Sequence, residues 1–173
     1  MKITLELSES DLAYFRDLLR TSRAASQHLV EADVLGAAEL LLRTVEQAQV
    51  PSFIAQRMLM LRRMIDMMRD QEFALADELR GSVVSALAYF SEPQDLIPDT
   101  VPVVGFLDDA IMIEIVRREL RPEIEAYEEF CSARDVSPTR VAAPQAYDDL
   151  IDQRRRNLFA RIRERRDHLN DFG

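Results

Sequence analysis

Residues 52–70, SFIAQRMLMLRRMIDMMRD, carry the clearest periodic pattern of the sequence. Apolar side chains recur there at intervals of three and four residues, which places them on one face of an α-helix. The members of this stripe are Ile54, Met58, Leu61, Ile65 and Met68. Met60, Met64 and Met67 widen the stripe, and methionine either fills irregular core gaps or lines a groove for a partner. We expect a long amphipathic helix whose stripe is buried in the core, with the partner groove as the alternative.

The segments around this helix repeat the same period, and their ends carry helix start and stop signals. Ser8 followed by Asp11 has the pattern of a capping box, and Pro51 suits the first turn of a helix. Further helices are expected at about 9–29, 31–49, 74–90, 108–121, 122–135 and 145–171. Residues 2–7, KITLEL, alternate apolar and polar side chains and predict a short N-terminal strand. The fold class that follows is an all-α bundle of six or seven helices, with a proline-rich turn between the fourth and the fifth.

The composition fits one soluble domain that has its own core. The chain has 173 residues, 47% of them hydrophobic, and this length buries a core without disulfides or metals. We expect a single helical domain over 1–173, in which residues 136–144, VSPTRVAAP, link a C-terminal helix. Cys131 is the single cysteine, so no internal disulfide is available and nothing favours secretion. The longest apolar run, VPVVGF, is far shorter than the ~20 residues of a membrane-spanning helix, so a cytoplasmic protein is expected.

Residues 95–109, DLIPDTVPVVGFLDD, interrupt the helical pattern between the fourth and fifth expected helices. Pro98 and Pro102 exclude an ordinary helix at their own positions and favour extended geometry in the residues before them. Gly105 permits a positive φ or a close backbone approach, and Pro93 ends the preceding helix. The stretch therefore predicts a proline-rich turn whose apolar residues fill the core between two helices.

This stretch resembles the YkvA-like family, a domain of unknown function numbered 1232. The family pattern has the form P-x-DLIPD-x-x-P-x-x-G-x-x-DD. The residues that match it are Pro93, Asp95, Leu96, Ile97, Pro98, Asp99, Pro102, Gly105, Asp108 and Asp109. The resemblance covers about residues 86–120 and implies a helix, the turn and a second helix, with no settled activity. Some relatives look membrane-associated, with longer apolar segments, whereas here Glu114, Arg117 and Arg118 interrupt the helix after the motif.

The four aspartates of the motif, Asp95, Asp99, Asp108 and Asp109, allow two chemical interpretations. In the first, Asp108 caps the next helix, Asp109 lies in its first turn, and the other two accept hydrogen bonds from turn amides. In the second, the carboxylates converge on a divalent cation such as Mg²⁺ or Ca²⁺, which then activates a water for hydrolysis. A third interpretation inserts the apolar segment 101–107 into a membrane surface, although anionic lipid would repel the acidic rim. We favour the first interpretation.

Residues 154–166, RRRNLFARIRERR, concentrate positive charge in a chain whose net charge is -9. The seven arginines are Arg154, Arg155, Arg156, Arg161, Arg163, Arg165 and Arg166. Such a block binds nucleic acid or phospholipid, or pairs with an acidic helix of the same chain or of a second copy, such as residues 123–130, EIEAYEEF. The interleaved Leu158, Phe159 and Ile162 favour docking on a helix. The acidic balance of the whole chain disfavours general nucleic-acid binding.

No catalytic residue is predicted from the sequence. It contains no GxSxG or HExxH motif, its glycines are too scattered for a phosphate-binding loop, and His28 and His168 lie far apart. We therefore expect a non-enzymatic interaction or scaffold module that contacts a protein partner or self-associates, with no cofactor. A divalent-metal-binding protein or metal-dependent hydrolase that uses the aspartates is the alternative. Peripheral membrane association is a further one.

Overall fold

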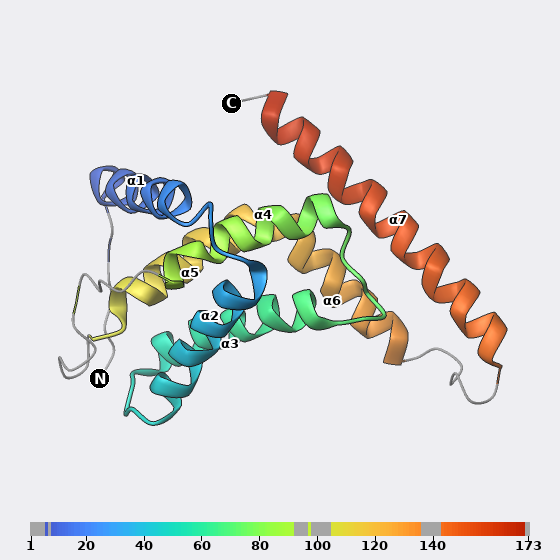
Figure 1. Ribbon diagram of the computed structural model, residues 1–173, viewed down its shortest axis with the longest axis horizontal. Helices are drawn as coiled ribbons and strands as arrows, with labels where there is room; N and C mark the ends of the chain where they lie inside the picture. Colours follow the sequence, from blue (N-terminus) through green and yellow to red (C-terminus); the bar gives the residue numbers. More distant parts are fainter. Residues whose placement is uncertain (1–5, 7, 92–96, 98–104, 136–142, 172–173) are drawn as a thin grey trace.

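The part of the chain described by a computed structural model contains seven α-helices and one short 3-10 helix (Figure 1). The structure describes residues 6, 8–91, 97, 105–135 and 143–171. The elements are α1 (Glu9–Ala25), α2 (Glu31–Glu46), α3 (Ser52–Arg69), α4 (Asp77–Leu87), η1 (Ala88–Ser91), α5 (Leu107–Glu119), α6 (Arg121–Asp135) and α7 (Pro144–Asp171). These described residues contain no strand, and the strand expected at 2–7 falls almost entirely outside them. The predicted all-α fold is confirmed.

The helix α3 lies at the centre of the packing and contacts α2, α5 and α6. Its predicted apolar stripe is buried over the whole length of the helix. The buried members are Ile54, Met58, Leu61, Met64, Ile65, Met67 and Met68. Met64 and Met67 have no exposed surface, so these methionines fill the core, and the alternative of a partner groove is wrong for them. The partly buried Met60 packs against the same core.

The helix α4 begins three residues later than the pattern predicted, because the chain turns sharply after α3. The Asp70 carboxylate accepts hydrogen bonds from the backbone amides of Glu72, at 3.0 Å, and Phe73, at 2.9 Å. Ala74 has a φ of 42°, a left-handed conformation that a right-handed helix does not contain. The expected start of the helix at residue 74 is therefore wrong. The turn places the Phe73 side chain in the core, where it has no exposed surface.

The N-terminal helix α1 begins with the predicted capping box. The Ser8 hydroxyl oxygen accepts a hydrogen bond from the Asp11 amide at 3.2 Å, and the Asp11 carboxylate accepts one from the Ser8 amide at 2.9 Å. The helix ends at Ala25 rather than at residue 29, because the chain turns after the C-cap residue Ser26, whose carbonyl oxygen accepts a hydrogen bond from the Leu29 amide at 3.0 Å. Only Leu19 and Ser22 of α1 are buried. This helix is therefore attached to the core through its second half.

An aromatic cluster joins the turn after α3 to the two C-terminal helices. The Phe73 ring centroid lies 5.1 Å from that of Tyr127, 5.2 Å from that of Phe130 and 5.2 Å from that of Phe159. The first two partners belong to α6 and the third to α7. The helix α7 starts one residue earlier than expected, because Pro144 forms its first position rather than the end of a linker.

The long helix α7 runs along α6 at one side of the molecule, and α5 begins at the opposite side (Figure 1). The start of α5, which carries Asp108 and Asp109, is therefore well separated in space from the arginine block of α7. None of the helices that the structure describes is both long enough and apolar enough to cross a membrane.

Candidate functional site

The second motif aspartate pair, Asp108 and Asp109, lies in the first turn of α5 and is buried. The two residues have 2% and 6% of their surface exposed. The N-cap position is occupied by Phe106, which makes no side-chain capping bond, so the expectation that Asp108 caps the helix is wrong. Instead, Oδ2 of Asp108 accepts a hydrogen bond from the backbone amide of Ile97 at 3.1 Å. This bond joins positions 11 residues apart and ties the entry of the motif turn to the start of α5.

The remaining motif residues fall partly outside the described chain. Asp95, Asp99, Pro93, Pro98 and Pro102 all lie there, whereas the turn before α5 is described and contains a buried Gly105. Among the residues with described positions, no three His, Cys, Asp or Glu side chains are grouped as metal ligands would be. A cation site built from all four aspartates therefore stays a prediction.

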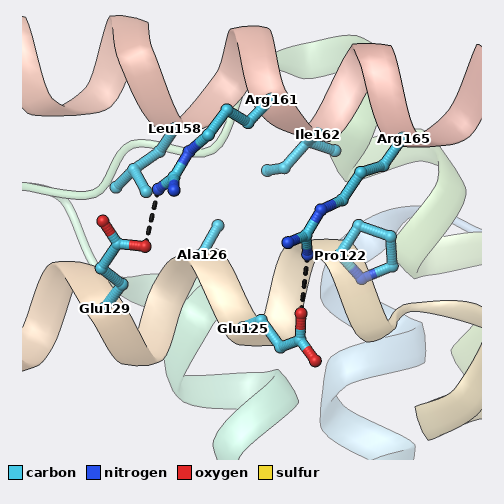
Figure 2. Close-up of a pocket in the computed structure, with 8 residues that line it drawn as sticks. All are labelled: Pro122, Glu125, Ala126, Glu129, Leu158, Arg161, Ile162 and Arg165. Atoms are coloured by element: carbon cyan, nitrogen blue, oxygen red, sulfur yellow. Dashed lines mark hydrogen bonds and ion pairs between the residues drawn. The ribbon is translucent and has the colours of Figure 1, made fainter.

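The arginine block forms a charged contact between α7 and α6, which we call the α6–α7 seam. Figure 2 shows the middle of this seam, where Arg161 and Arg165 of α7 extend on either side of Ala126 toward carboxylates of α6. The pairs of the seam are Arg161 with Glu129 at 2.6 Å, Arg165 with Glu125 at 2.7 Å, and Arg166 with Glu123. The two helices are antiparallel here, so residue numbers increase along α7 and decrease along α6 from one pair to the next. The acidic stretch 123–130 is thus a partner of the arginines within the same chain.

Most of the other arginines in the block also contact their own chain. Arg163 pairs with Glu78 at the start of α4 at 2.6 Å, and Arg155 pairs with Asp152 one turn earlier at 2.6 Å. Arg154 is also engaged within the chain. Arg156 is exposed and forms no ion pair with the described residues. These contacts match the intramolecular alternative for the block, and contact with an outside molecule stays a prediction.

The innermost pair of the seam combines a buried carboxylate with a half-buried guanidinium. Glu123 has no exposed surface, and one of its carboxylate oxygens accepts a hydrogen bond from Arg166 Nε. Its other oxygen and Nη2 of Arg166 are buried without a hydrogen-bond partner among the described atoms. Removal of one member of a buried pair leaves an uncompensated charge. The half-buried neighbour Glu125 has a pKa below its ordinary value, because the guanidinium groups of Arg121 and then Arg165 stabilise its charged form.

A second polar cluster, which the sequence did not indicate, lies where the turn after α3 meets α6 and α7. Arg134 Nη1 donates to Asp70 at 2.9 Å and to Glu72 at 3.2 Å. The hydroxyl groups of Tyr127 and Tyr147 donate to Asp70 and Glu72, each at 3.2 Å. Burial favours a raised pKa of the Asp70 carboxyl, but the Phe73 amide and Arg134 outweigh it, so the pKa lies below the ordinary value. This cluster fixes the turn to both C-terminal helices.

The charged residues that interrupt the helix after the motif form a small network on the surface. Glu114 contacts Arg117 at 2.8 Å, Arg118 at 3.0 Å and Arg57 of α3 at 3.3 Å. The hydrogen bond from Arg117 is the main reason why the pKa of Glu114 is lowered. Arg118 is exposed, so its pair with Glu114 contributes little to stability.

These features define an all-α protein in which Asp108 of the motif binds the Ile97 amide and the arginine block pairs a C-terminal helix with α6. Residues 80–115, from within α4 to within α5, match the model of a family described as Protein of unknown function (DUF1232). This match confirms, over that segment, the resemblance that the motif predicted. No curated protein and no solved structure matches the chain.

Proposed function

We propose that the protein is a non-enzymatic helical interaction module. This proposal rests on one observation. The charged residues that were candidates in the sequence form hydrogen bonds and ion pairs with groups of their own chain. Asp108 holds a backbone amide of the turn, and the seam arginines hold carboxylates of α6. Residues used in this way stabilise the fold and leave the helix faces as the surfaces for contacts with other molecules.

The outer faces of α2 and α3 supply contact points for a second copy of the chain. Leu40 of α2 and Leu59 of α3 are large apolar side chains with 58% and 60% of their surface exposed. Single exposed apolar residues are common on monomers. A test therefore has to compare Leu40 and Leu59 with an exposed apolar residue elsewhere on the surface. Tyr14 of α1, which is 55% exposed, lies on another helix and provides a matched control position.

Native mass spectrometry of the purified chain without added metal tests this proposal. The expected result is a metal-free mass corresponding to two or more copies, which Leu40→Glu and Leu59→Glu shift toward the single chain. The control Tyr14→Glu should leave the distribution unchanged, and all three variants should keep the helical circular dichroism of the parent. Metal-free single chains throughout, or an equal effect of the control, would contradict self-association through α2 and α3.

A second candidate function is divalent-cation binding. The observation that favours it is the burial of two adjacent carboxylates, Asp108 and Asp109, at the start of one helix, since buried carboxylates are often paired or bound to metals. Added Mg²⁺, Ca²⁺, Mn²⁺ or Zn²⁺ should then raise the melting temperature, and Asp109→Asn should abolish the rise. The same native mass spectrum, with one or two extra ions per chain, would support this candidate over the interaction module.

A further inference from the structure

The helix α7 is attached to the rest of the molecule by one narrow apolar row, by its ion pairs with α6 and α4, and by the hydrogen bond from Tyr147 to Glu72. Its buried residues are Tyr147, Ile151, Leu158, Phe159 and Ile162. The remaining side chains of residues 143–168 are exposed or half-buried. The helix lies at the edge of the fold, beside α6 (Figure 1). Its buried residues join the core around α3, but most residues of that core belong to the helices before α7. Displacement of α7 therefore leaves most of the core in place.

The surface beneath α7 is an apolar groove with an acidic rim. Its floor includes Phe73, which meets Phe159 edge to face, together with Phe130 and Ala126 of α6, which lie beside Leu158. The rim consists of Glu125 and Glu129 of α6 and Glu78 of α4, and the fully buried Glu123 lies inside it, paired with Arg166. Each rim glutamate pairs with an arginine of α7, so the groove is complementary in charge to a basic amphipathic helix.

The contact between helix and groove is incompletely closed on one side. A hollow lined by residues that include Pro122, Ala126 and Ile162 lies under the ion pairs of Arg161 and Arg165 (Figure 2). A second hollow adjoins it, and Leu158 contributes to both. Ion pairs at this level of exposure are individually weak and are screened by salt. The ion pairs of Arg161 and Arg165 can therefore break at low cost, whereas Leu158 and Ile162 beneath them belong to the buried core.

We propose that α7 is an internal ligand of a helix-binding groove, and that this groove binds a partner protein's amphipathic helix. The partner helix carries arginines four residues apart beside an apolar row, which is the pattern of Arg161, Arg165 and Leu158, Ile162 in α7. This inference deepens the proposed function by assigning a partner class to one face. It does not depend on self-association through α2 and α3, so either idea can fail alone.

A fluorescent peptide with the sequence of residues 144–171 stands in for the partner helix. Its binding to the full chain is measured by fluorescence anisotropy. In the parent chain, the resident α7 competes at a high effective concentration, so binding of the peptide is weak. The double variant Arg161→Glu/Arg165→Glu repels its own α7 from the intact rim. We expect this chain to bind the unmodified peptide at least tenfold more tightly than the parent does, with a decrease at high salt.

Two controls separate the groove from general electrostatics. The chain variant Arg20→Glu/Arg156→Glu changes the net charge equally but alters neither Arg161 nor Arg165, and it should bind as weakly as the parent. A peptide with glutamate in place of Arg161 and Arg165 should bind neither the parent chain nor the double variant. Since Arg161 and Arg165 are about half exposed, the double variant should keep its fold, and the milder Arg161→Gln/Arg165→Gln should show the same order of affinities.

Equal affinity of the peptide for the parent and the double variant would overturn the proposal, as would no binding to either. Formation of a dimer by exchange of α7 between two copies would also overturn it, because the occupant would then be a second copy. A disulfide between Glu129→Cys and Arg161→Cys in a Cys131→Ser background reports this exchange. We expect it within single chains on a non-reducing gel, whereas bonds between chains indicate exchange.

Discussion

Substitution of Asp108 by alanine tests the role assigned to the motif. The change removes the acceptor that lies 3.1 Å from the Ile97 amide, at a position with 2% exposed surface. A donor left without a partner costs about 1–3 kcal/mol. Loss of a negative charge from the first turn of α5 costs a further ~0.3–1 kcal/mol through the helix dipole. Asp108→Ala is therefore expected to lower the free energy of unfolding by about 1–4 kcal/mol.

Two companion variants separate the contribution of the hydrogen bond from that of the helix dipole. Asp108→Asn keeps a carbonyl oxygen in the acceptor position and removes the charge, so its loss should be smaller than that of the alanine variant. Asp33→Ala removes an exposed aspartate from the first turn of α2 and reports the dipole contribution alone, about 0.3–1 kcal/mol. Urea unfolding gives all three values, with an unchanged m-value as the sign of an unchanged two-state transition. An asparagine variant as unstable as the alanine variant, or an Asp108→Ala loss no larger than that of Asp33→Ala, would refute the hydrogen-bond assignment.

Three further changes test the packing and the polar cluster. Gly81→Ala in α4 should stabilise the protein by ~0.5–1 kcal/mol in urea unfolding, because a Cβ there meets nothing within 4 Å and alanine loses less backbone entropy than glycine; a loss of stability would contradict this. Met64→Ala should cost about 2–5 kcal/mol, since the side chain is fully buried, while Leu59→Ala on the same helix should stay within ~0.5 kcal/mol. The lowered pKa of Asp70 stabilises the fold above the unfolded-state value of about 4, and this contribution is lost as the pH falls through the folded-state value. Urea midpoints between pH 6 and pH 3 should therefore fall less steeply in Asp70→Asn than in the parent, and parallel curves would show that Asp70 is not the group involved.

Local periodicity predicted the parts of the fold that depend on neighbouring residues. The α3 stripe was located correctly from its spacing, because burial of one helix face imposes a period that the sequence displays. The capping box at Ser8 was also correct, since its partners are three residues apart. The start of α4 was wrong, because residues 74–76 are compatible with a helix, and the turn depends on hydrogen bonds to the Asp70 side chain.

Contacts between distant segments were predicted less completely. The arginine block was expected to pair with residues 123–130 as one alternative, but the individual pairs follow from the antiparallel placement of α7, which no local pattern encodes. Arg134 and Asp70 are 64 positions apart, so their cluster left no signal in the sequence. The residue type at Asp108 indicated a hydrogen-bond acceptor correctly, whereas its donor, 11 positions earlier, emerged only from the path of the turn.

The shallow attachment of α1 makes the stability of the molecule uneven along the chain. Its buried residues, Leu19 and Ser22, both lie in its second half, so the first two turns depend on the capping box and on partly buried side chains. Segments with few buried contacts open at a lower free energy than the whole molecule. Amide protons in those turns should therefore exchange with solvent through local fraying, while those of α3 exchange only when the core comes apart. The first two turns of α1 can therefore open at low energetic cost while the second half of the helix, the aromatic cluster and α3 stay folded.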